Sequence, residues 1–170
     1  MSKVISWINE KIIHTENSKI KSEDIDYIRD FTLLWNLFES LCFDDKFANM
    51  NKINNIIDSK IDLFEEEKYK NIFDYFYDRY KNDNNKFRKL NLRNSEKELV
   101  KKVLNDEYNN KNNKLKFIMA IIYRYRNNLF HGEKEMRYIR FQKENFEVTN
   151  EFLMYFIEVC INRTGNMKDF

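Results

Sequence analysis

Apolar side chains recur every three or four residues along most of this chain, which is the period of an amphipathic helix. The clearest run covers residues 22–42. Its apolar positions fall on one stripe: Ile25, Ile28, Phe31, Trp35, Phe38 and Cys42. Ser22 is predicted to cap this helix, because acidic residues follow it in the first turn and favour the positive end of the helix dipole. The pattern therefore predicts a long helix with one wide buried face.

The same period predicts further helices elsewhere in the chain. They cover residues 3–14, 44–63, 65–80, 95–104 and 149–160. Ser95 and Glu98 match a Ser-x-x-Glu capping box at the start of the helix over 95–104, and Thr149 or Asn150 is placed to cap the last helix. Residues 81–94 and 133–147 show no clear period. We expect a long connection in the first segment and a long loop with partial helix in the second.

Residues 115–130 form the most apolar helical run in the chain. Apolar side chains occupy nearly all of its faces, whereas a surface helix has only one apolar stripe. This helix is therefore predicted to lie in the middle of the core, at a subunit interface, or both. Gly132 follows closely and is well placed to terminate it near residues 130–132.

The composition favours helices and excludes several other classes. The chain has no proline and only 2 glycines, whereas turn-rich β folds use more of both. We therefore predict an all-α fold: one up-and-down bundle of about five to seven helices over residues 1–170, with a frayed tail from about residue 164. No apolar run is long enough to span a bilayer and no signal-peptide layout is evident, which indicates a cytoplasmic protein. Cys42 and Cys160 lie in apolar helical patterns and are predicted to be buried free thiols.

A polar cluster follows the apolar run, and it contains one of the chain's 2 histidines, His131. Arg126 precedes His131 by five positions, so on a continuous helix the two side chains would point about 140° apart. They can converge on one target only if the helix ends near Phe130, or if two copies of the chain meet across a symmetric interface. Either arrangement would create a site at the end of a buried helix.

The residue types in this cluster suit phosphate chemistry. An arginine offers a fixed fork of donors to a phosphate and stays charged, and a histidine near neutrality can move a proton. Arg126 and His131 together suffice for RNA cleavage without a metal or cofactor, in which the ribose 2′-hydroxyl attacks the adjacent phosphate. Asn127 is a candidate to orient the imidazole or to hold a phosphate oxygen. A chance occurrence of the spacing, with both groups in structural roles, is the alternative.

The stretch Arg126-Asn-Asn-Leu-Phe-His-Gly132 closely resembles the signature of the HEPN superfamily, in which an arginine and a histidine are separated by a short spacer. The segment over residues 34–39 also resembles a helix of those proteins. The resemblance implies an all-α bundle that forms a two-fold dimer through the motif-bearing helix. It further implies a metal-independent endoribonuclease with Arg126 and His131 as catalytic pair and Asn127 as polar accessory. Many such proteins are toxins or act in defence against phage, sometimes with a restraining partner protein.

Other charged residues are candidates to contact RNA. Arg124, Lys134 and Arg137 flank the motif and form a possible basic rim for an RNA backbone, although ordinary surface charge explains them equally. Glu39 is either a surface carboxylate or a charge that faces a basic residue of the site. Tyr123 is a candidate to stack on bases. The net charge of +2 is too small to argue for nucleic-acid binding by itself.

Three functions remain open at this point. The first is a dimeric HEPN-like endoribonuclease with a toxin-like or anti-phage role, whose partners are a second copy, RNA and a restraining antitoxin or defence protein, with no membrane. The second is a catalytically silent HEPN module that binds a nucleotide or a protein and dimerises. The third is an unrelated helical scaffold that carries the motif by chance.

Overall fold

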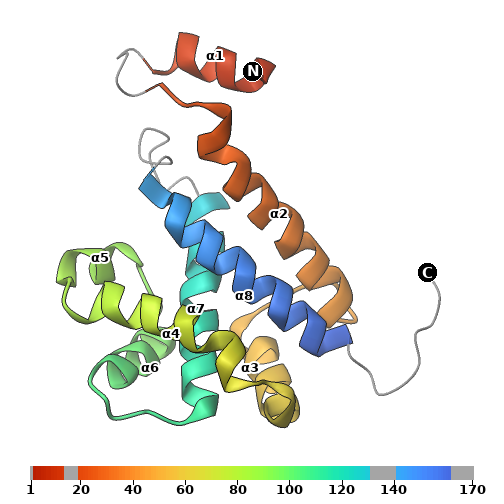
Figure 1. Cartoon of the computed structure of the whole chain (residues 1–170), viewed down its shortest axis with the longest axis vertical. Helices are drawn as coiled ribbons and strands as arrows, with labels where there is room; N and C mark the ends of the chain where they lie inside the picture. Colours follow the sequence, from red (N-terminus) through yellow and green to blue (C-terminus); the bar gives the residue numbers. More distant parts are fainter. Residues whose placement is uncertain (1, 14–18, 131–140, 162–170) are drawn as a thin grey trace.

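The computed structural model describes residues 2–13, 19–130 and 141–161, and these form helices joined by short connections (Figure 1). The elements are α1 (Lys3–Lys11), α2 (Ser22–Cys42), α3 (Met50–Lys60), the 3-10 turn η2 (Ile61–Leu63), α4 (Glu66–Lys81), α5 (Asn84–Lys89), α6 (Asn94–Leu104), α7 (Lys111–Phe130) and α8 (Lys143–Ile161). None of the described residues lies in a strand. The predicted all-α class is therefore confirmed.

The described ranges contain eight α-helices, whereas five to seven were predicted. The additional helix is α5, inside the segment expected to be a long connection. Its N-cap is Asp83, whose carboxylate accepts a hydrogen bond from the backbone N–H of Lys86 at 2.9 Å. A helix of 6 residues makes fewer than two turns, so it leaves no apolar period in the sequence.

Helix α7 lies in the middle of the fold. All side chains from Leu115 to Tyr125 are buried except that of Lys116, which is partly exposed. Helices α3, α4 and α6 pack on α7, and Trp35 of α2 and Phe146 of α8 approach it on the remaining sides. The apolar character of α7 on nearly all faces is thus explained by packing within one chain. Along this buried stretch α7 offers no apolar face to a second copy.

Helices α2 and α8 form the most extensive helix pair, although they stand near opposite ends of the sequence (Figure 1). They run parallel, because Tyr27 and Asn150 meet in the first half of each helix, whereas Cys42 and Cys160 line one pocket where both helices end. In an up-and-down bundle, α2 would instead pack mainly against its sequence neighbours. The predicted up-and-down order is therefore wrong, and the pairing of α2 with α8 replaces it.

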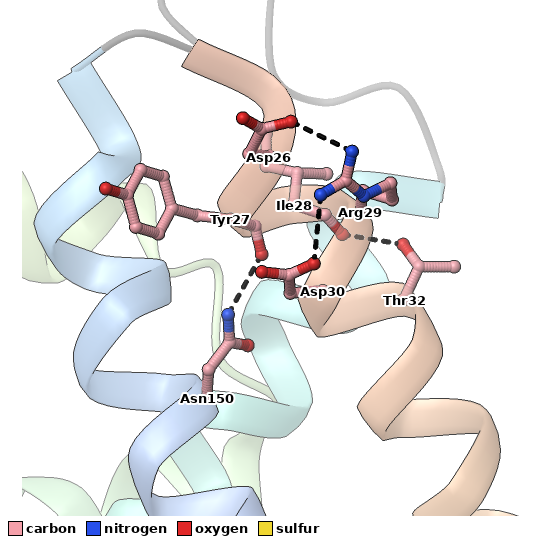
Figure 2. A network of polar contacts seen from close by, with 7 residues as sticks. All are labelled: Asp26, Tyr27, Ile28, Arg29, Asp30, Thr32 and Asn150. Carbon is pink, nitrogen blue, oxygen red and sulfur yellow. Dashed lines mark hydrogen bonds and ion pairs between the residues drawn. The ribbon is translucent and has the colours of Figure 1, made fainter. Parts of the chain in front are cut away.

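The start of α8 also differs from the prediction. The helix begins at Lys143, so Thr149 and Asn150 lie in its interior and do not cap it. Both are buried, and the Asn150 amide donates a hydrogen bond of 3.0 Å to the Tyr27 carbonyl of α2 (Figure 2). A buried asparagine that binds another helix has the same appearance in a sequence as a helix cap, which explains the error.

Two further helix starts are shifted. The N-cap of α2 is Lys21 rather than Ser22, and the N-cap of α6 is Arg93, two residues before Ser95. In both helices a carboxylate of the first turn accepts the N-cap backbone N–H: Asp24 from Lys21 at 2.8 Å and Glu96 from Arg93 at 3.2 Å. The proposed Ser-x-x-Glu box is therefore wrong, since Glu96 takes the position assigned to Glu98.

Helix α1 packs apart from the main core. Ile5, Ile13 and Ile20 form a small separate apolar cluster, whereas the main cluster draws on α2 to α8. The Asn9 side chain makes two hydrogen bonds to the backbone of Ile20, just before α2, at 2.7 and 2.8 Å. Helix α1 is thus attached at the start of α2 without contributing to the core that supports α7.

The contact between Asn150 and Tyr27 leads to a stability prediction. Asn150→Ala should lower the free energy of unfolding by about 1 kcal/mol, because a buried interhelical hydrogen bond is lost. Glu151→Ala is the matched control: it changes the next residue of α8, which is exposed, and should stay within about 0.5 kcal/mol of the parent. Chemical denaturation followed by circular dichroism measures both. Equal stability of the two variants would contradict a structural role for Asn150.

Candidate functional site

The described half of the motif lies on the last turns of α7. Arg126 and Asn127 are on this helix, and its described part extends to Phe130. His131, Lys134 and Arg137 lie outside the described residues. The expected end of the helix near residues 130–132 and the meeting of Arg126 with His131 therefore stay predictions.

Arg126 is held by contacts on two sides. Its guanidinium carbon lies 5.8 Å from the centre of the Trp35 ring of α2, a cation–π contact. Its Nη1 donates a hydrogen bond of 3.2 Å to the side-chain oxygen of Asn127. The Arg126 residue is only partly buried. These contacts restrict the orientation of the guanidinium and leave part of the residue accessible, as a phosphate-binding arginine requires.

Asn127 is buried and bonded to the arginine of the motif. It is 6% exposed, and its side-chain oxygen accepts a hydrogen bond from Arg126. This bond restricts the orientation of the Arg126 guanidinium. That Asn127 orients the imidazole or holds a phosphate oxygen stays a prediction.

Arg124 does not belong to an exposed basic rim. It is 6% exposed, and its guanidinium donates hydrogen bonds of 3.2 Å to the Leu90 carbonyl and to the Asn128 side-chain oxygen. The Asn128 amide donates to the same Leu90 carbonyl, also at 3.2 Å. Because Arg124 and Asn128 are four residues apart, they share one face of α7. Together they attach the end of α5 to the motif helix, so the expectation that Arg124 contacts RNA on the surface is wrong.

Two other candidates have structural contacts. One carboxylate oxygen of Glu39 accepts a hydrogen bond of 3.1 Å from the Ala48 backbone N–H, so Glu39 orders the loop after α2. A role of Glu39 beside a basic residue of the site stays a prediction. Tyr123 is 9% exposed, with its ring centre 6.0 Å from that of Trp35. Its position in the core leaves little surface for stacking on a base.

Two buried tyrosines lie next to the site. The hydroxyl groups of Tyr80 and Tyr125 are hydrogen-bonded to each other. Burial, followed by the neighbouring Tyr80 hydroxyl, raises the pKa of Tyr125 well above its ordinary value, and burial also raises the pKa of Tyr80. Both phenols therefore remain neutral near pH 7.

Sequence reasoning did not assign a site role to Trp35. Its place on the apolar stripe of α2 predicted a core residue, and it is indeed 3% exposed. Nothing in the spacing of α2 and α7 shows that the two helices meet at Arg126. The sole signal in the sequence was the resemblance of residues 34–39 to a HEPN helix. That resemblance covers Trp35 without giving it a function.

Comparison of the chain with models of protein families, with curated proteins and with solved structures finds no match. The resemblance to the HEPN superfamily therefore depends on the motif and on residues 34–39 alone. Within the described ranges, no three His, Cys, Asp or Glu side chains are grouped so that they would hold a metal ion. No helix in that part of the chain has the length and apolarity needed to cross a membrane.

The buried position of Arg124 leads to a second stability prediction. Arg124→Ala should lower the free energy of unfolding by about 2 to 3 kcal/mol, since the Leu90 carbonyl and Asn128 lose a charged donor. Lys89→Ala removes an exposed cation from the adjoining helix and should stay within about 0.5 kcal/mol of the parent. Thermal and chemical denaturation measure the difference. An Arg124→Ala protein with parental stability but weaker RNA binding would restore the basic-rim interpretation.

Proposed function

We propose that this protein is a metal-independent endoribonuclease of the HEPN type that acts as a homodimer. The strongest support is that Arg126, on the last turns of α7, stacks on Trp35 and is hydrogen-bonded to Asn127. His131 follows Arg126 by five positions in the sequence. A guanidinium restrained in this way can bind an anion without first losing conformational freedom. The residue that follows at the motif spacing is a proton carrier.

The proposed reaction uses both side chains. The His131 imidazole takes the proton of a ribose 2′-hydroxyl, and the resulting oxygen attacks the adjacent phosphorus. The bond from phosphorus to the 5′-oxygen breaks, which leaves a 2′,3′-cyclic phosphate on one fragment and a 5′-hydroxyl on the other. Arg126 stabilises the negative charge that develops on the phosphate oxygens. Asn127 holds the guanidinium in position for that charge.

A row of cations along α6 supports a polyanionic substrate. The N-cap Arg93 and the α6 residues Lys97 and Lys101 are exposed and four residues apart, so they form one stripe. The ion pair that the described residues show on this helix joins Lys102 to Glu98, and neither belongs to the stripe. Like charges at this spacing destabilise a helix by a few tenths of a kcal/mol per pair. An RNA backbone would offset this repulsion. The stripe begins close to the motif helix, because Leu90, three residues before Arg93, is hydrogen-bonded to Arg124 and Asn128 of α7.

The outer face of α2 supports a second copy of the chain. Leu33, Leu37 and Leu41 are 61%, 40% and 36% exposed and lie on one stripe. Every exposed residue over positions 32–41 is uncharged. Because Leu33 and Leu41 are spaced equally about Leu37, a two-fold axis at Leu37 pairs each leucine with another leucine. The dimer would thus form through α2, the helix that supports Arg126, rather than through the buried part of α7.

The nuclease proposal predicts a specific cleavage pattern. Purified protein should cut single-stranded RNA in the presence of EDTA and leave 2′,3′-cyclic phosphate ends. His131→Ala and Arg126→Ala should each lower the cleavage rate by at least about a hundredfold, because a proton carrier or the charge stabilisation is lost. Gel analysis of labelled RNA measures the rate, and mass spectrometry of the fragments identifies their ends.

Two controls separate chemistry from binding. Lys97→Glu, on the exposed stripe of α6, should weaken RNA binding with little effect on the maximal rate. Expression of the parent chain should slow growth of a host cell and that of His131→Ala should not, as expected of a toxin or defence nuclease that needs a restraining partner. If parent and His131→Ala are equally inert on varied RNAs and equally tolerated, the silent-module alternative replaces the nuclease.

The dimer proposal has its own test. Leu37→Asp should convert the dimer to a monomer, because it places a charge on the two-fold axis of an apolar contact. Phe47→Asp, at another exposed apolar residue, should leave the dimer intact. Light scattering at micromolar concentration measures the mass, and circular dichroism shows that both variants fold. A parent chain that is strictly monomeric under these conditions would contradict the α2 interface.

A further inference from the structure

The chain has only 2 cysteines, and the fold brings them together. Cys42 is the last residue of α2 and Cys160 is the penultimate residue of α8. Both cysteines line one surface pocket, which lies where these two helices end. They are separated by 118 positions of the sequence (160 − 42), so neither spacing nor local structure accounts for their meeting.

The pocket gives reagents access to the thiols. Besides the two cysteines it is lined by Ser40, Leu41, Phe43, Asp44, Ile56 and Lys60. Leu41, Phe43 and Ile56 are apolar, whereas Ser40, Asp44 and Lys60 admit water and a polar reactant. Cys42 is partly exposed and Cys160 is buried. A small polar reagent would therefore meet the Cys42 sulfur first.

We propose that Cys42 and Cys160 are a redox-active dithiol, which a small disulfide such as oxidised glutathione converts to an intramolecular disulfide. This proposal uses none of the motif residues, and its one overlap with the proposed dimer is Leu41, which lines the pocket and ends the apolar stripe of α2. It concerns the ends of α2 and α8 that lie away from Arg126, because Trp35 stands two turns of α2 before Cys42.

The oxidation proceeds in two thiol exchanges. The Cys42 thiolate attacks one sulfur of the small disulfide, which forms a mixed disulfide and releases one small thiolate. The Cys160 thiolate then attacks the Cys42 sulfur, forms the internal bond and releases the second small thiolate. Two electrons pass from the protein to the small disulfide, and the protons from the two cysteines end on the two released thiols.

The environment makes this oxidation slow at neutral pH. The hydrogen bond with Cys160 and burial raise the pKa of Cys42 well above its ordinary value, and the nearby Lys60 ammonium opposes the shift. Since the thiolate is the attacking species, the rate should rise as the pH is raised toward that pKa. The pair is therefore suited to sustained oxidising conditions rather than to a rapid response.

The test uses the full-length reduced protein with oxidised glutathione at pH 8. The intact mass should fall by the two hydrogens lost, and a maleimide should no longer label either cysteine under native or denaturing conditions. Peptide mapping without reductant should find the Cys42 and Cys160 peptides joined. The oxidised protein should melt roughly 5 to 10 °C higher than the reduced protein, since the bond constrains a long loop of the unfolded chain.

Single-cysteine variants identify the order of the steps. Cys160→Ser should stop at one glutathione added to Cys42, while Cys42→Ser should react far more slowly because Cys160 is buried. The variant with both serines should show no change in mass or melting temperature. A stable glutathione adduct on the parent, a disulfide between two chains, or two thiols that react only after unfolding would each overturn the proposal.

Discussion

The burial of α7 on all sides is the constraint on which the rest of the structure depends. A helix that is apolar from Leu115 to Tyr125 on nearly every face has to be enclosed, and no single neighbour can enclose it. The chain does so with α3, α4 and α6, and with aromatic side chains of the α2–α8 pair. The enclosure fixes the axis of α7 and therefore the place at which its last turns emerge. Those turns carry Arg126 and Asn127.

Because α7 is enclosed, the polar residues of its last turns face different neighbouring helices. Arg124 and Asn128 lie on one face and bind the Leu90 carbonyl. Arg126 is two residues from each, which puts it about 160–200° around the helix, toward Trp35. Two arginines that look equivalent in the sequence thus receive different tasks. One attaches α5 to the helix, and the other is stacked and partly accessible.

The parts of this fold that the sequence predicted are those governed by a long apolar period. Helices α2 and α7 each span five or more turns, so their stripes were unambiguous. Helix α5 is too short to show a period, and the start of α8 was missed because Asn150 resembles a cap while it binds Tyr27. At the site, the motif identified Arg126 but not its support. The contact with Trp35 and the meeting of Cys42 with Cys160 depend on which helices pack together, and no local pattern encodes that.

The pairing of α2 with α8 links the two ends of the molecule mechanically. Asn150 fixes the pair near its start, and the two thiols meet near its end. Trp35 lies between these points on α2, so the position of the ring that stacks on Arg126 depends on how firmly the pair is held. A covalent bond at the thiol end would restrict sliding of α2 along α8 without touching the motif. The proposed thiol chemistry thus lies about two turns of α2 away from the ring that stacks on Arg126, and α2 is the element that connects them.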